Sequence, residues 1–130
     1  MSQSSCRPIS APVAYLLLAC AALNFGGAAL FAPPCTALRA AMGLPEAPAT
    51  YLWILALWIL VFGLGYLDIA RKRRFEPTFL AAGAAGKATF SLLLITGWLD
   101  GELPARAALG SLSDLLLAGV FVWLIVRRQK

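Results

Sequence analysis

The sequence predicts an all-α membrane protein in which four transmembrane helices form an up-down-up-down bundle. Composition is the first observation behind this prediction. Hydrophobic residues make up 61% of the 130 residues and charged residues only 13%, against about 45–50% and about 25% in an average soluble domain. A chain this short cannot bury such an excess in a globular core, so the excess must face lipid. Composition therefore excludes a soluble enzyme, a disordered tail and a secreted disulfide scaffold.

The second observation is that the apolar residues fall into four runs, each close to the roughly 20 residues that a membrane-spanning helix needs. The first run covers 12–32, and Pro33 with Pro34 ends it, because proline cannot continue a helix. The other three cover 50–70, 78–99 and 107–126. Short connections make neighbouring helices antiparallel, so residues 1–130 are expected to form a single membrane domain.

The longest connection joins the first two runs and contains Arg39 and Glu46. Its residues 35–44 are a candidate for a short interfacial helix. The run before it follows Arg7, as in a signal peptide, but it continues past Cys20 through Phe31. A signal peptide has an apolar core of only about 7–15 residues, so we expect this run to be retained as the first span.

Lysine and arginine are distributed unequally between the two sides of the predicted bundle, which sets its orientation. Arg39 and Arg106 lie on one side, and Lys87 lies inside the third span. The other side carries the remaining eight basic residues, Arg7, Arg71, Lys72, Arg73, Arg74, Arg127, Arg128 and Lys130. The positive-inside rule then places both termini in the cytoplasm.

Aromatic residues agree with these boundaries, because tyrosine and tryptophan favour both membrane–water interfaces. The belts consist of Tyr15, Tyr66 and Trp123 near the cytoplasm, and of Tyr51, Trp53 and Trp98 near the outside. Trp58 lies near mid-span and is expected to pack against a neighbouring helix. Cys6 and Cys35 lie on opposite sides in this topology, and no CxxC spacing is present, so no disulfide framework is expected.

Lys87 and Asp114 are the most informative residues, because each interrupts an apolar span. A charge at the centre of a spanning helix costs about 2.5–3.5 kcal/mol on insertion scales. At a rise of 1.5 Å per residue, Lys87 lies about 14 Å and Asp114 about 18 Å from the cytoplasmic edge. Consecutive spans form a hairpin, so the two depths nearly match and an ion pair is predicted.

Polar and small residues accompany this pair. Ser91 shares a helix face with Lys87 and Ser111 shares one with Asp114, since residues three or four apart lie on one face. Asn24 in the first span lies at a similar depth and can join the layer as donor and acceptor. Two interpretations stay open: a structural pin that fixes helix packing, or a site for a ligand, an ion or a proton.

The connection between the second and third spans is a run of basic residues, Arg71, Lys72, Arg73 and Arg74. We interpret it as a topology signal that contacts lipid headgroups, which attract nearby basic residues by about 1 kcal/mol each. Nucleic-acid binding would need a larger basic surface with base-reading side chains, and we do not expect it.

Four short motifs resemble small bacterial four-helix membrane proteins of the DoxX-like kind. The similar segments are NFG at 24–26, FGLGY at 62–66, Gly86-Lys87, and SDLL at 113–116. This resemblance implies a four-helix integral membrane protein of a bacterial inner membrane and no settled reaction.

The leading functional hypothesis is a scaffold or accessory subunit that assembles as a homo-oligomer or within a larger membrane complex, with a structural Lys87–Asp114 pair. The alternative is a small proton-coupled transporter or lipophilic-ligand binder that uses the same pair. An enzyme is not expected, nor is a metal or cofactor, because the chain has no histidine and no nucleophile–base pair. A cavity lined by Lys87 and Asp114 would favour the alternative.

Overall fold

The computed structural model describes residues 8–129; Cys6, Arg7 and Lys130, to which the predicted topology refers, lie outside the described residues. The described part is all-helical, as predicted, and contains no β-strand apart from one isolated bridge. Four of its helices are long and apolar enough to cross a membrane, so the protein is a small multi-pass membrane protein. The elements in chain order are α1 (Ala11–Phe31), α2 (Thr36–Met42), α3 (Ala49–Lys72), α4 (Pro77–Leu99) and α5 (Ala105–Gln129).

Most of the apolar surface of the four long helices faces outward. In each helix, no more than 28% of the most apolar window is buried inside the protein. Leu93 on α4 and Leu116 on α5 are 65% and 73% exposed. Exposed apolar area this extensive marks a membrane-facing surface, which agrees with the composition argument.

Proline and glycine set several of the helix ends. The helix α1 ends at Phe31, and Pro33 and Pro34 follow the C-cap residue Ala32. Pro77 occupies the first turn of α4, where its missing N–H costs nothing. The short helix α2 closes on Gly43, whose φ of 73° is left-handed, a conformation that glycine adopts without strain.

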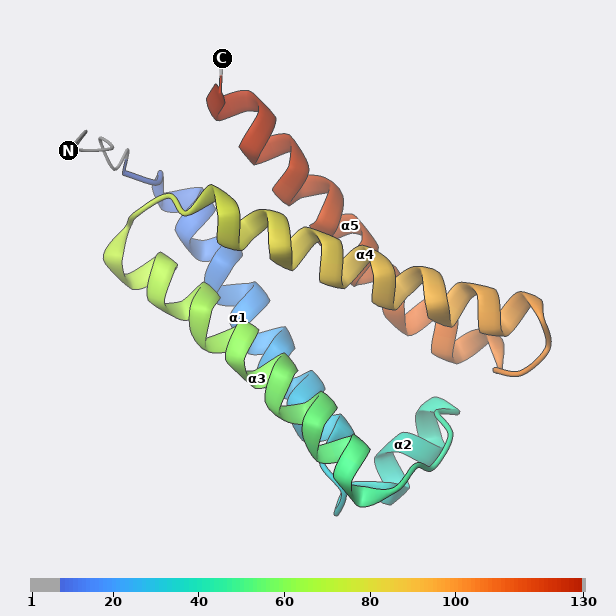
Figure 1. Ribbon diagram of the computed structural model, residues 1–130. Coiled ribbons are helices and arrows are strands. Elements are labelled where there is room, and N and C mark those ends of the chain that lie inside the picture. The colour runs from blue at the N-terminus through green and yellow to red at the C-terminus, as the bar shows by residue number, and fades with distance from the viewer. Residues whose placement is uncertain (1–7, 130) are drawn as a thin grey trace.

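The long helices pack as two antiparallel hairpins, α1 with α3 and α4 with α5 (Figure 1). In each hairpin, residues with rising numbers on one helix contact residues with falling numbers on the other, which shows that the two helices are antiparallel. The contacts that show this are Ile9–Arg73 and Asn24–Ile59 in the first hairpin, and Lys87–Asp114 and Ser91–Ser111 in the second.

The two hairpins meet at the end of the molecule that carries most of the basic residues. Pro8 forms a bridge with Arg74. Arg128 of α5 donates a hydrogen bond to the Pro8 carbonyl at 3.2 Å and stacks on the Phe75 ring at 4.6 Å. The start of α1, the α3–α4 connection and the end of α5 therefore lie together, and the hairpins diverge from this end toward α2 (Figure 1).

The larger hydrophobic core lies where the hairpins meet. Leu17, Tyr66, Leu80 and Phe121, one from each long helix, are fully buried there. The Tyr66 ring lies 5.4 Å from the Phe79 ring and 5.3 Å from the Phe121 ring. Aromatic pairs at such distances add stability beyond their buried area, so Tyr66 connects the two hairpins.

A smaller core lies farther along, on the side of α2, and it consists of Phe31, Leu52 and Ala56. Phe31 of α1 meets Phe90 of α4 edge to face, with ring centroids 6.0 Å apart. The hairpins therefore touch at two levels, and the space between these levels is the site described next.

Candidate functional site

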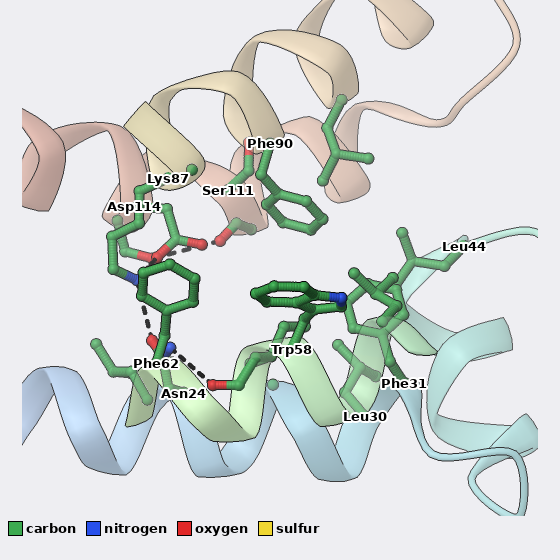
Figure 2. Close-up of a pocket in the computed structure, with 18 of the residues that line it drawn as sticks. Asn24, Leu30, Phe31, Leu44, Trp58, Phe62, Lys87, Phe90, Ser111 and Asp114 are labelled. Atoms are coloured by element: carbon green, nitrogen blue, oxygen red, sulfur yellow. Dashed lines mark hydrogen bonds and ion pairs between the residues drawn. The ribbon is translucent and has the colours of Figure 1, made fainter. Parts of the chain in front are cut away.

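Lys87 is the centre of a polar network that joins all four long helices (Figure 2). Its Nζ lies 2.5 Å from Oδ1 of Asp114 on α5 and donates to Oδ1 of Asn24 on α1 at 3.1 Å. The Asn24 amide in turn donates to the backbone carbonyl of Ile59 on α3 at 3.1 Å. The ion pair expected from the two depths is present, and Asn24 belongs to the same network.

The two charges of the pair are not equally buried. The Lys87 side chain is 9% exposed, whereas the Asp114 side chain is 26% exposed. The ammonium also lies 5.9 Å from the centroid of the Tyr66 ring, within the range of a cation–π contact. The lysine is therefore enclosed by an amide, a carboxylate and an aromatic face, while the carboxylate remains accessible.

Ser91 and Ser111 lie one turn away from the pair and connect α4 to α5. The Ser91 hydroxyl donates to the Ser111 backbone carbonyl at 2.7 Å, and the Ser111 hydroxyl donates to the Ala108 carbonyl at 2.8 Å. Both serines are buried, and hydroxyl contacts of this kind hold spanning helices together. Of the two serines, only Ser111 lines the cavity.

A cavity of about 330 Å³ lies between the two hairpins, and Lys87, Asp114 and Asn24 line its polar end. Figure 2 shows these residues at one end and Leu30, Leu44 and Phe31 toward the other. The rest of the lining is mostly apolar, with aromatic rings from Phe31, Trp58, Phe62, Tyr66 and Phe90. An apolar cavity with a few convergent polar groups is the usual form of a small-molecule site.

Trp58 does not pack against a neighbouring helix as the sequence had suggested. Its side chain lies in the space between the hairpins (Figure 2), and the residue is 62% exposed. Leu23, which also lines the cavity, is 54% exposed. The hairpins diverge at this level, so the indole stays largely exposed and the cavity reaches the outer surface of the spans.

Tyr66 carries an unsatisfied polar group beside the pair, and sequence reasoning missed it. Its hydroxyl is buried and has no hydrogen-bond partner. The hydroxyl oxygen lies against Gly83 of α4, where a Cβ would clash with it. Tyr66 was assigned to the cytoplasmic aromatic belt from its position, but the residue is fully buried. No periodicity reveals this, because α3 is apolar on every side.

Arg39 is a second residue whose role the sequence did not indicate. It is fully buried on α2 and donates to the carbonyls of Leu30, Ala32 and Pro33 at 3.3, 2.5 and 3.0 Å. It also contacts Glu46 at 3.2 Å. The last carbonyls of a helix lack partners within the helix, and Pro33 and Pro34 have no N–H to offer. An arginine that follows two consecutive prolines at the end of a span is the sequence signal that could have indicated this cap.

The basic connection Arg71, Lys72, Arg73 and Arg74 is exposed, as a headgroup contact requires. Lys72 pairs with Asp68 at 2.8 Å, a surface ion pair one turn apart that contributes little stability. At the end of α5, Arg127 stacks on Trp123 at 4.9 Å. None of these basic residues lines the cavity.

Among the described residues, no group of three His, Cys, Asp or Glu side chains could hold a metal ion. Cys20 is buried and Cys35 is half-buried, and both are free thiols. Comparison with known proteins adds no relative: no family model, no curated protein and no solved structure matches the chain. The interpretation of the site therefore depends on its geometry.

Proposed function

We propose that the protein binds a small lipophilic molecule in the cavity between its two hairpins, with Lys87 and Asp114 at the polar end of the site. The observation that carries this proposal is that the pair lines a cavity of about 330 Å³ instead of being sealed between packed helices. This volume is at the small end of the range of roughly 300–1,000 Å³ for small-molecule sites.

Energetics support binding over a purely structural pair. Replacing a buried ion pair by apolar residues is often neutral or stabilising, so stability alone gives little reason to keep two charges in the membrane. The unpartnered Tyr66 hydroxyl adds a cost of about 1–3 kcal/mol. A cluster of costly polar groups around an open volume is typical of a site that a ligand completes.

The bilayer is the route by which such a ligand would enter. The exposed cavity residues Leu23 and Trp58 belong to α1 and α3, two of the spanning helices. Gly86 on α4 is also exposed and lines the cavity, and a Cβ there would meet no atom within 4 Å. The opening therefore lies on the side of the spans, where lipid and not water is the neighbour.

The membrane arrangement belongs to the same proposal. We propose an up-down-up-down topology with both termini in the cytoplasm of a bacterial cell, in the inner membrane. Its support is that Arg128 contacts Pro8 and Phe75 at the end that also holds the basic α3–α4 connection, so that most positive charge gathers on one side. The DoxX-like resemblance remains part of this proposal, since it implies four spans.

We propose binding and not catalysis, and we assign no cofactor. The chain has no histidine, and Lys87 is occupied by two oxygen partners. A proton-coupled carrier would use the same pair and the same cavity, and transport in liposomes would distinguish it from a binding protein.

A scaffold or accessory subunit is the second candidate, and one observation favours it. The hydrogen bond from Lys87 to Asn24 joins the α4–α5 hairpin to α1, which is what a structural pin would do. A scaffold would function with the cavity filled, whereas a ligand-binding protein would not.

Filling the cavity without touching its polar end is therefore the test. Gly86→Leu adds a side chain at a residue that lines the cavity and has free space in front of it. Gly26→Leu is the matched control, because Gly26 is equally open but does not line the cavity. The measurement is mass spectrometry of lipophilic molecules that are retained by purified protein in nanodiscs of one defined lipid.

We expect at least one compound to be retained by the wild type and by Gly26→Leu and to be lost from Gly86→Leu. If a deletion strain has a cellular phenotype, Gly86→Leu should fail to rescue it, because the compound is lost from that variant. Identical retained compounds in all three proteins, with a phenotype that Gly86→Leu rescues, would support the scaffold instead.

A further inference from the structure

We propose that the ligand is electrically neutral and presents a hydroxyl or N–H donor to the Asp114 carboxylate, as a lipophilic alcohol or phenol does. This inference rests on the proposed function, since it names the chemical class that the cavity accepts. Three features of the site carry it: the charge of the pair, the polarity of the exposed group and the nature of the lining.

The pair has no net charge, because one ammonium faces one carboxylate at 2.5 Å. An anionic ligand would meet the accessible Asp114 carboxylate, and a cationic ligand would have to share that carboxylate with the Lys87 ammonium, because the cavity lining holds no further unmatched charge. Burying an ion without a counter-charge is strongly unfavourable. The site therefore selects against charged ligands.

The accessible polar groups of the cavity are acceptors, since the unpartnered Tyr66 hydroxyl is buried against Gly83. The Lys87 ammonium is the more enclosed partner and donates to Asn24 and Asp114. The contact between Lys87 and Asp114 uses Oδ1 of the carboxylate, and Oδ2 has no hydrogen-bond partner among the described residues. Ser113, which also lines the cavity, donates its hydroxyl hydrogen to the Gly110 carbonyl at 3.4 Å. A ligand at this end must therefore supply the hydrogen.

The body of the ligand must match an aromatic surface. The Trp58 side chain lies in the cavity, and the Phe62 and Phe90 rings lie near it (Figure 2). Such rings bind flat apolar groups by stacking or edge contacts. A neutral ring system with one hydroxyl therefore matches both ends of the cavity.

Four probes of one skeleton separate these contributions. They are 2-naphthol, which is neutral and a donor; 2-methoxynaphthalene, which is neutral without a donor; 2-naphthoate; and 2-naphthylmethylammonium. Each is measured by equilibrium dialysis against protein in nanodiscs, and binding to Gly86→Leu is subtracted, which removes partition into lipid. Gly26→Leu must bind as the wild type does.

We expect 2-naphthol to bind about tenfold more tightly than 2-methoxynaphthalene, because a hydrogen bond to a carboxylate is charge-assisted. Both ionic probes should bind more weakly than either neutral probe. If the methoxy probe binds as well as the naphthol, or if an ionic probe binds most tightly, the ligand class is wrong although the cavity is a binding site. If no probe binds above Gly86→Leu, the proposed function itself fails.

Charge variants give an independent readout. In Asp114→Asn the Lys87 ammonium is unmatched, so 2-naphthoate should become the tightest-binding probe. In Lys87→Met the Asp114 carboxylate is unmatched, so 2-naphthylmethylammonium should become the tightest-binding probe. The double variant Lys87→Met/Asp114→Leu has neither charge, and its ratio of naphthol to methoxy affinity should fall to about one. It keeps the test decisive if the single variants fold poorly, because an unchanged ratio would contradict the proposal.

Discussion

The Lys87 ammonium has oxygen partners on two other helices, Asp114 on α5 and Asn24 on α1. Its contacts therefore hold one hairpin together and also join the two hairpins. Removing either member of the ion pair leaves a buried charge without compensation, which costs more than the pair contributes. Substitutions at this site should consequently couple strongly.

Each single substitution, Lys87→Met or Asp114→Leu, should lower the yield of folded protein because it leaves the other charge uncompensated. The double variant removes both desolvation penalties and should recover most of the yield. Monodisperse protein after size-exclusion chromatography in mild detergent is the measurement. Two harmless and additive single variants would show that the residues do not interact.

Arg39 supports stability in a different way, because it caps the end of α1. Arg39→Leu should lower stability by about 2 kcal/mol or more, since the half-buried carbonyls of Leu30 and Pro33 lose the guanidinium that donates to them. Arg106→Leu removes an exposed arginine and should change stability by less than about 0.5 kcal/mol. Thermal unfolding of the two variants in the same detergent checks this, and equal melting temperatures would refute the cap.

Packing between α3 and α4 depends on the contact of Tyr66 with Gly83. Gly83→Ala should destabilise the protein, because its Cβ would collide with the Tyr66 hydroxyl. Tyr66→Phe removes the unsatisfied hydroxyl and should be neutral or stabilising. The double variant should be more stable than Gly83→Ala alone, as measured by thermal unfolding. A double variant no better than Gly83→Ala would mean that the hydroxyl does not limit the approach of the two helices.

The number of long helices could be predicted from the sequence because length and hydropathy alone determine which segments can span a bilayer. The depths of Lys87 and Asp114 followed from the rise per residue, which is why their contact could be anticipated. The cavity could not. It depends on the angle between two hairpins, and helices that are apolar on all sides carry no periodic signal of which side faces the partner.

The short helix α2 illustrates the same limit. Residues 35–44 were expected to lie at the interface, and α2 does form within them. What the sequence did not reveal is that Arg39 turns inward and that Met42 and Leu44 line the far end of the cavity. Those contacts follow from how the connection reaches from the end of α1 to the start of α5, which local propensity does not specify.

The molecule as a whole is two hairpins that meet at one end and diverge toward α2 (Figure 1). With the basic end in the cytoplasm, a reporter fused to the C-terminus should be active only as a cytoplasmic reporter. In a variant whose own cysteines are replaced by serine, a cysteine introduced at Glu102, which is exposed in the α4–α5 connection, should react with a membrane-impermeant maleimide added outside the cell. Labelling of Glu102→Cys only after lysis would show that the orientation is the opposite of the one proposed.

The cavity between the hairpins is the central claim, and the position of a bound molecule tests it most directly. Crystals grown from a lipidic mesophase with 6-bromo-2-naphthol would locate the bromine by its anomalous scattering. We predict a peak between α3 and α4 near Trp58, with the naphthol hydroxyl directed at Asp114. Hairpins closed against each other, with Lys87 and Asp114 sealed and no bromine between them, would contradict the account.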